Sequence, residues 1–178
     1  MAQALQFSRK LAMGNSFHLL KIVQSLNVSN ARTQALLEML VLCGTARANS
    51  DAEKNLIVFL AGRDQSRCGD GLAGFEINAM PWEILEFEAQ RRFIADVVDD
   101  ALARTDWSKL DYEPSPEVFA PVLKTFKEMV EKLECCEIAP NRDWTPPDAY
   151  VVCERHSMLK FPGHLYGKNE YICIRCDQ

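Results

Sequence analysis

The stretch "SPEVFAPVLKTFKEMVEKL", residues 115–133, shows most directly how this chain folds. Its apolar side chains recur three and four residues apart and cover an arc of roughly 140° on a helical wheel, opposite a charged face. Ser115 is suited to cap the N-terminus, and Pro116 fits the first helical position. The stretch therefore predicts an amphipathic helix packed by one face onto a core.

Helical signals also fill the first third of the chain. Leucines and valines between residues 19 and 26 follow Ser16, a good N-cap, and residues 31–43 continue the pattern until Gly44, which we expect to end that helix. Residues 50–53 form a capping box that opens a third helix, ending at Gly62. The run 55–62 is short enough to be a buried strand instead, but the capping box favours a helix.

The middle of the chain predicts a loop and then a long helix. Residues 63–81 are rich in glycine and polar side chains, with a short strand expected at 75–77. From Trp82 to Leu102 the apolar residues share one broad arc, and Trp107 and Leu110 continue the packing into the next turn. The aromatic residues of this region are more typical of a core than of a ligand cage.

These patterns predict a mainly α-helical fold. We expect a bundle-like domain of five or six helices over residues 1–137, a proline-rich linker at 138–149, and a small zinc-binding β-knuckle at 150–178. A unit as small as the last one cannot bury enough surface alone, so a bound ion would contribute much of its folding energy.

Charge is distributed unevenly along the 178 residues. The net charge is −5, with residues 1–50 at +4, residues 51–149 at −10 and the remainder at +1. The acidic balance makes nucleic acid an unfavourable partner and suits a basic partner protein. No apolar run approaches the ~20 residues that span a bilayer, so we expect no membrane partner.

The cysteine content indicates a reducing compartment. Seven cysteines, an odd number, do not form a regular disulfide framework, and no secretory leader is visible at the start of the sequence. Cysteines in such a chain are more often free thiols or metal ligands. We therefore expect a cytoplasmic protein; the sequence sets no oligomeric state.

The most specific chemical signal lies in the tail. Cys153-x2-His156 and Cys173-x2-Cys176 are two potential ligand pairs separated by sixteen residues. A two-residue spacer lets both side chains of a tight turn converge on one ion, and the intervening loop brings the two turns together. This spacing resembles zinc knuckles and zinc ribbons, which implies a zinc ion held by Cys153, His156, Cys173 and Cys176.

Other ligand sets remain open from the sequence. His164 can replace His156, and Cys135 or Cys136 can contribute a thiolate, although we expect Leu133 and Cys136 to pack inward at a helix end. Four protein ligands leave no position for a reacting water, which favours structural over catalytic zinc. Glu154 lies somewhat as in the zinc deaminase pattern, but no proline precedes Cys173.

Two further motifs fit their chemistry poorly. "GDGLAG", residues 69–74, has the glycine spacing of a dinucleotide site, yet no strand precedes it directly and no helix follows. Cys68 beside it would need His18 as a distant base. The carboxylates Glu83, Glu86, Asp96 and Asp99 are similar to those of all-α nucleotide pyrophosphatases. However, Asp96 and Asp99 fall on a solvent-facing arc on which Arg92 is spaced to form ion pairs within the helix, whereas Glu83 and Glu86 point nearer the buried side.

The function expected from these observations is therefore that of a non-enzymatic interaction or regulatory protein with a structural zinc, which binds or neutralises a basic partner protein. The first alternative is a metal-dependent hydrolase that uses the four carboxylates. The second is a nucleic-acid-binding protein whose zinc tail contacts phosphates and bases through the following basic and aromatic residues: Arg155, Lys160, Lys168, Arg175, Tyr166 and Tyr171.

Overall fold

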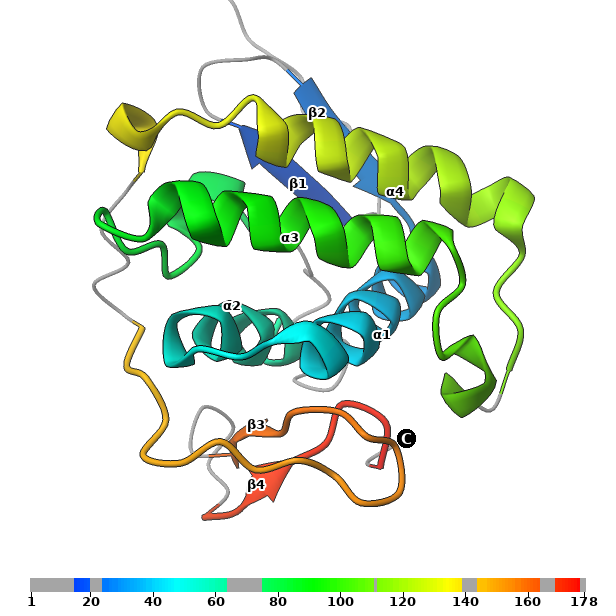
Figure 1. Ribbon diagram of the computed structural model, residues 1–178. Helices are drawn as coiled ribbons and strands as arrows, with labels where there is room; N and C mark the ends of the chain where they lie inside the picture. The colour runs from blue at the N-terminus through cyan, green and yellow to red at the C-terminus, as the bar shows by residue number, and fades with distance from the viewer. Residues whose placement is uncertain are drawn as a thin grey trace, which may run out of the picture.

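The computed structural model describes residues 15–19, 24–63, 75–110, 112–138, 144–163 and 169–176, with the backbone alone at 15–19, 24–28 and Asn30. This part of the chain contains four α-helices and four short strands (Figure 1). The helices are α1 (Asn30–Arg47), α2 (Asp51–Ala61), α3 (Phe87–Leu102) and α4 (Pro116–Glu131). The mainly helical class is confirmed; the expected five or six helices are not. None of these helices is long and apolar enough to cross a membrane.

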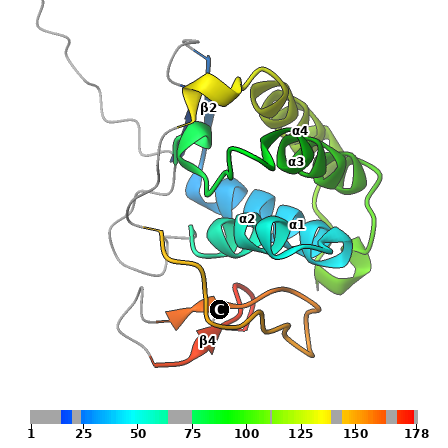
Figure 2. The same ribbon diagram turned by 60° about the vertical axis from the view of Figure 1, so that its left-hand side comes forward.

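The elements stack in three layers, which both views show (Figures 1 and 2). Helices α3 and α4 pack side by side at one face, α1 and α2 form the middle, and the C-terminal tail lies against the other face. Every residue from 35 to 44 and from 55 to 61 is buried. A helix that is apolar all round belongs inside a structure, so α1 and α2 require cover on both sides.

The tail is part of the same hydrophobic core as the helices. Met158, Leu159, Phe161, Ile172 and Ile174 are at most 5% exposed and join the cluster formed by the helical body. Strands β3 (Phe161–Pro162) and β4 (Tyr171–Ile172) pair antiparallel there, and β3 contacts α2. The tail therefore supplies the cover that α1 and α2 need.

The predicted helix 115–133 is confirmed as α4, with Pro116 at its start. Ser115 occupies the N-cap position but makes no capping hydrogen bond; its hydroxyl donates to the Glu117 carboxylate at 2.7 Å instead. The capping box of α2 is confirmed, since Ser50 accepts from the Glu53 N–H and the Glu53 carboxylate accepts from the Ser50 N–H. These reciprocal hydrogen bonds fix the start of α2, and the run 55–62 therefore belongs to a helix rather than to the alternative buried strand.

The helix predicted after Ser16 is wrong. Residues 15–28 contain two antiparallel strands, β1 (Asn15–Leu19) and β2 (Gln24–Val28), in which Phe17 pairs with Leu26 and His18 with Ser25. This register places all four apolar residues of the two strands on one face and four of their six polar residues on the other. The period of two is the better description of the sequence, because half of the leucines and valines used for the helical pattern lie between the strands.

Two boundaries in the middle of the chain also differ from the prediction. No strand forms at 75–77; a 3₁₀ turn, η2 (Ile77–Ala79), begins there, in which the Met80 N–H donates to the Ile77 carbonyl at 3.2 Å. Helix α3 begins at Phe87 rather than Trp82. A turn occupies residues 84–86, and the Glu83 N–H donates to the Gln90 side chain rather than within a helix. Trp107 and Leu110 lie in another 3₁₀ turn, η3 (Trp107–Leu110), and are buried as expected.

Gly44 does not end α1, as the sequence predicted, but lies within it. A Cβ atom added to Gly44 would lie 2.2 Å from Cδ1 and 2.7 Å from Cγ1 of Ile57 on α2. Gly44 and Ile57 are both buried, so little room exists for either helix or side chain to move and relieve this overlap. The glycine is therefore a contact point that lets α1 and α2 approach closely.

Gly44→Ala is expected to destabilise the protein by about 1–3 kcal/mol, the usual result of overpacking a core. Helix propensity alone would give the opposite sign, because alanine is favoured over glycine inside a helix by about 1 kcal/mol. Urea unfolding measures the change. The variant Ile57→Ala removes the opposing atoms, so Gly44→Ala should cost much less in that background. A gain in stability for the single variant would contradict the close packing.

Candidate metal centre

The first ligand pair is held by a tight hairpin in the tail. Strand-like pairing joins Val152 to Leu159, and the Cys153 N–H donates to the Met158 carbonyl at 2.8 Å. The Ser157 N–H closes the turn on the Cys153 carbonyl at 2.8 Å, with Ser157 in the left-handed region at φ 54°. This turn points both Cys153 and His156 into the tail, where they are 4% and 2% exposed.

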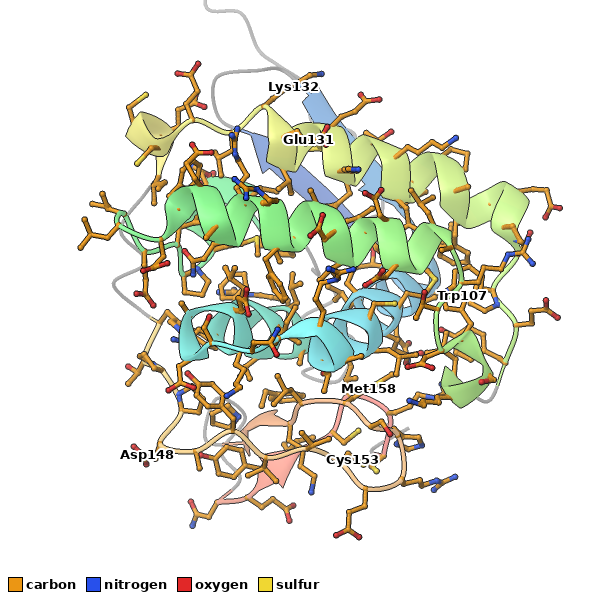
Figure 3. All side chains as sticks on the ribbon, viewed as in Figure 1. Trp107, Glu131, Lys132, Asp148, Cys153 and Met158 are labelled. Atoms are coloured by element: carbon orange, nitrogen blue, oxygen red, sulfur yellow. The ribbon has the colours of Figure 1, made fainter. Side chains whose placement is uncertain are left out.

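The second ligand pair follows β4. Pairing of Phe161 with Ile172 brings the end of β4 beside the first hairpin, and the Cys176 N–H donates to the Cys173 carbonyl at 3.2 Å. Cys173 is buried, whereas Cys176 is exposed. In Figure 3, Cys153 lies within the tail, and Met158 lies on the side that faces the helices.

The two pairs form one cluster that can hold a metal ion. One ligand atom from each of Cys153, His156, Cys173 and Cys176 lies within 4.8 Å of the others. The His156 Nδ1 atom is 3.8 Å, 3.6 Å and 3.4 Å from the sulfurs of Cys153, Cys173 and Cys176 respectively, and Cys153 Sγ is 3.6 Å from Cys176 Sγ.

These distances fit a tetrahedral ion. A centre with bonds of about 2.3 Å to sulfur and about 2.0 Å to nitrogen separates its ligand atoms by about 3.5–3.8 Å. Four of the six donor–donor separations, at 3.4–3.8 Å, are close to this range, and all six are at most 4.8 Å. Every corner is occupied by a protein atom.

The thiols differ in their tendency to ionise. Burial raises the pKa of Cys173 to about 12, and burial together with the neighbouring Cys153 thiol raises that of Cys176. Burial also opposes ionisation of Cys153, but hydrogen bonds from the His156 N–H and from the Cys176 and Cys173 thiols outweigh it and lower its pKa. Cys153 is thus the thiol of the cluster that most readily becomes a thiolate ligand.

Of the alternative ligands, the two described cysteines do not join this cluster. Cys135 and Cys136 lie in the exposed 3₁₀ turn η4 (Cys135–Glu137), at the opposite side of the molecule from the tail (Figures 1 and 2). The expected inward packing is correct for Leu133, which is fully buried, and wrong for Cys136. The turn exposes Cys136 because the chain leaves α4 before another helical turn can form. His164 lies outside the described residues.

Specific contacts fix the tail on α1 and α2. The Leu159 N–H donates to Thr45 Oγ1 at 2.9 Å, and the Tyr150 hydroxyl lies 2.9 Å from Asn55 Oδ1. Trp144 packs edge-on against Phe59 with ring centroids 5.4 Å apart, so it pins the tail to the helical body. The metal cluster is therefore anchored to the core on several sides.

A buried ionic network, which the sequence analysis missed, joins the cluster to α1. Glu38 is 1% exposed in the middle of α1, and Arg175, between the ligands Cys173 and Cys176, lies 3.6 Å from its Oε2 atom. Tyr112 donates its hydroxyl to the same oxygen at 2.8 Å, and Gln34 donates its amide to Oε1 at 3.1 Å. The sequence did contain one signal for this network. Glu38 is the only acid in the first 50 residues, and it lies inside an apolar run.

The four carboxylates of the hydrolase hypothesis do not converge. Asp96 pairs with Arg47 at 3.3 Å, Asp99 pairs with Lys127 at 2.6 Å, and Glu83 and Glu86 are exposed in the turn before α3. Within the described residues, the Cys/His cluster is the one group of three or more potential ligands close enough to hold a metal.

The acidic face of α3 instead binds its neighbouring helices. Arg47 of α1 makes a bidentate contact with Asp100, at 2.7 Å and 2.9 Å, and the hydrogen bond to Asp100 raises the pKa of Arg47. The hydrogen bond to Asp99 likewise raises the pKa of Lys127 on α4. These pairs join helices, whereas the sequence predicted pairing within α3 through Arg92.

The described residues of the nucleic-acid hypothesis differ in their exposure and in their contacts with the rest of the protein. Arg155 is exposed, but Arg175 turns toward Glu38 and stacks over the Tyr112 ring with its guanidinium carbon 5.0 Å from the centroid. The Tyr171 hydroxyl accepts from the Ala149 N–H at 3.2 Å. Tyr166, Lys168, Cys68 and the glycine-rich stretch 69–74 lie outside the described residues, and for His18 only the backbone in β1 is described.

Comparisons of the chain with protein-family models, with curated proteins and with solved structures found no match.

Proposed function

We propose that this chain is a non-enzymatic protein-interaction protein that binds a basic partner, with a structural zinc ion held by Cys153, His156, Cys173 and Cys176. The observation that carries the proposal is the closed tetrahedral arrangement of these four donor atoms. A catalytic zinc usually keeps one position for water or substrate, and here each corner belongs to a side chain.

Zinc suits this donor set better than other common ions. Three sulfurs and one imidazole nitrogen in tetrahedral positions favour zinc in a reducing compartment, whereas magnesium and calcium prefer oxygen ligands. When bound, such an ion would cross-link the two turns of the tail. The positive charge of Arg155 favours the thiolate form of Cys176 and so opposes part of the effect of burial on its pKa.

The position of the cluster supports a structural role. The tail covers the buried helices α1 and α2 with apolar side chains, and the two ligand turns hold this cover in shape. Glu154, the counterpart of a deaminase general base in the sequence pattern, is exposed. The charge of the molecule favours a basic partner, because the chain carries a net charge of −5 and most of its acids lie in residues 51–149.

Metal analysis of the purified full-length protein tests the zinc assignment. Mass spectrometry is expected to find one zinc per chain, and X-ray absorption at the zinc edge is expected to show three sulfur neighbours, one nitrogen and no oxygen. An oxygen ligand in the first shell would indicate an open position and contradict the structural role. Protein purified without chelators that contains no metal would overturn the zinc site altogether.

A further inference from the structure

The turn that leads into α3 exposes two large aliphatic side chains. Ile84 is 74% exposed and Leu85 is 96% exposed, while Trp82 and Phe87 on either side are buried and pack edge-on with ring centroids 5.6 Å apart. Val152 in the tail, at 48%, is the third exposed large hydrophobic side chain among the described residues. Of these three residues, only Ile84 and Leu85 are neighbours, and both lie in the turn.

Buried hydrogen bonds hold this turn in one shape. The Trp82 indole donates to the Ile77 carbonyl at 2.7 Å, and the Glu83 N–H donates to Gln90 Oε1 at 2.7 Å. Gln90 is 1% exposed and donates its amide to the Ala52 carbonyl at 3.1 Å, which ties the turn to the start of α2. The exposed apolar pair is thus presented by a fixed backbone, so little conformational entropy would be lost when a partner covers it.

Acidic side chains surround the apolar pair. Glu83, Glu86 and Glu88 are all exposed. The neighbouring Arg91 donates to Glu88 at 2.6 Å and also to the carbonyl of Glu131 at 2.8 Å, at the end of α4. Glu83 and Glu86 thus form a negative rim. Two copies of this turn would repel each other, which argues against self-association through it.

We propose that the turn 83–86 is the docking point for a basic partner protein, which receives Ile84 and Leu85 in an apolar pocket and contacts Glu83 and Glu86 with lysines or arginines on its rim. An apolar centre inside a charged rim is the usual anatomy of a protein interface, and a few central side chains supply most of its affinity. The inference rests on the proposed partner-binding function and assigns a surface to it.

Peptide selection on the full-length protein provides the test. A displayed library of random 12-residue peptides is selected on the immobilised protein, and the peptides recovered are synthesised and measured by calorimetry. The expected peptides combine aliphatic residues with lysine or arginine. The variant Ile84→Ser/Leu85→Ser should weaken their binding about tenfold or more. Its thermal unfolding should be unchanged because both side chains are exposed.

Three further measurements separate the possible results. Val152→Ser, the matched control, should bind the peptides as the native chain does. Glu83→Gln/Glu86→Gln should weaken binding at low salt and reduce its dependence on salt concentration. Sedimentation with vesicles of phosphatidylcholine and phosphatidylglycerol should show no binding to the lipid. Vesicle binding that is lost in the Ile84→Ser/Leu85→Ser variant would overturn the protein partner in favour of a membrane.

Two other outcomes distinguish a failure of the docking point from a failure of the proposed partner-binding function. If the selected peptides bind the Ile84→Ser/Leu85→Ser variant as tightly as the native chain, the turn is not the docking point, although partner binding stands. If no peptide binds the native chain above background, both the docking point and the partner-binding function are overturned.

Discussion

Cys173→Ala is expected to abolish metal binding and to unfold the tail, with the largest loss of stability of any single change considered for this chain. Cys173 is a buried member of the cluster, and three remaining donors no longer close the tetrahedron. Binding of structural zinc contributes about 10–16 kcal/mol to folding in zinc-finger peptides. A whole domain is stable by only about 5–15 kcal/mol, so even a fraction of that energy is decisive.

The effect should extend beyond the tail. Met158, Leu159 and Phe161 share one core with α1 and α2, so their loss exposes helices that are buried on all sides. We therefore expect Cys173→Ala to lower the unfolding temperature of the helical signal in circular dichroism, and a chelator to have the same effect on the native chain. Metal content should fall from one zinc per chain to nearly none.

Cys136→Ala is the matched control, because this cysteine is exposed and stands apart from the cluster. It should retain the metal and the native unfolding temperature. A Cys173→Ala protein that keeps its zinc, or that unfolds at the native temperature, would show that the four residues do not form the stabilising centre.

Arg175→Met is expected to destabilise the protein by about 3 kcal/mol, the lower end of the range for breaking a buried ion pair. The change removes a counter-ion from the Glu38 carboxylate, which is 1% exposed and cannot regain water without opening the core. Arg175 itself keeps 15% of its side chain exposed, which places the estimate at the low end. Methionine retains much of the side-chain volume, so lost charge should dominate over lost packing.

A double-mutant cycle isolates this interaction. Glu38→Gln removes the charge but keeps the shape, and Arg175→Met in that background should cost much less than in the native chain. Arg155→Met provides the control, since Arg155 occupies the equivalent position of the first ligand turn and is exposed. Urea unfolding measures all five proteins: the native chain, the two single variants of the cycle, the double variant and the Arg155→Met control. Equal costs for Arg155→Met and Arg175→Met would contradict the role of the Glu38 pair.

The sequence was most informative where a pattern was local. Residues 115–133 carried their own amphipathic period, and Ser50 with Glu53 specified the start of α2 by mutual hydrogen bonds. The ligand spacing 153–156 and 173–176 likewise predicted which four side chains would converge. In each case the residues that decide the geometry lie within a few positions of one another.

The features that the sequence did not reveal depend on contacts between distant segments. Gly44 resembled a helix stop, but its role follows from Ile57 on a neighbouring helix. The partners of Asp96 and Asp99 come from α1 and α4, which no pattern within α3 could indicate. The β1–β2 pair was misread because a short apolar run fits two periods, and only pairing between strands decides between them.

The Glu38–Arg175 pair also affects how this protein can fold while it is being synthesised. Glu38 lies in α1, whereas Arg175 leaves the ribosome only after α2, α3 and α4 have been synthesised. Until then the interior of α1 carries a carboxylate without this arginine, and the face that the tail covers remains open. We therefore expect the nascent chain to stay incompletely packed through most of its synthesis, with closure of the long loop between the two residues as a late step of folding.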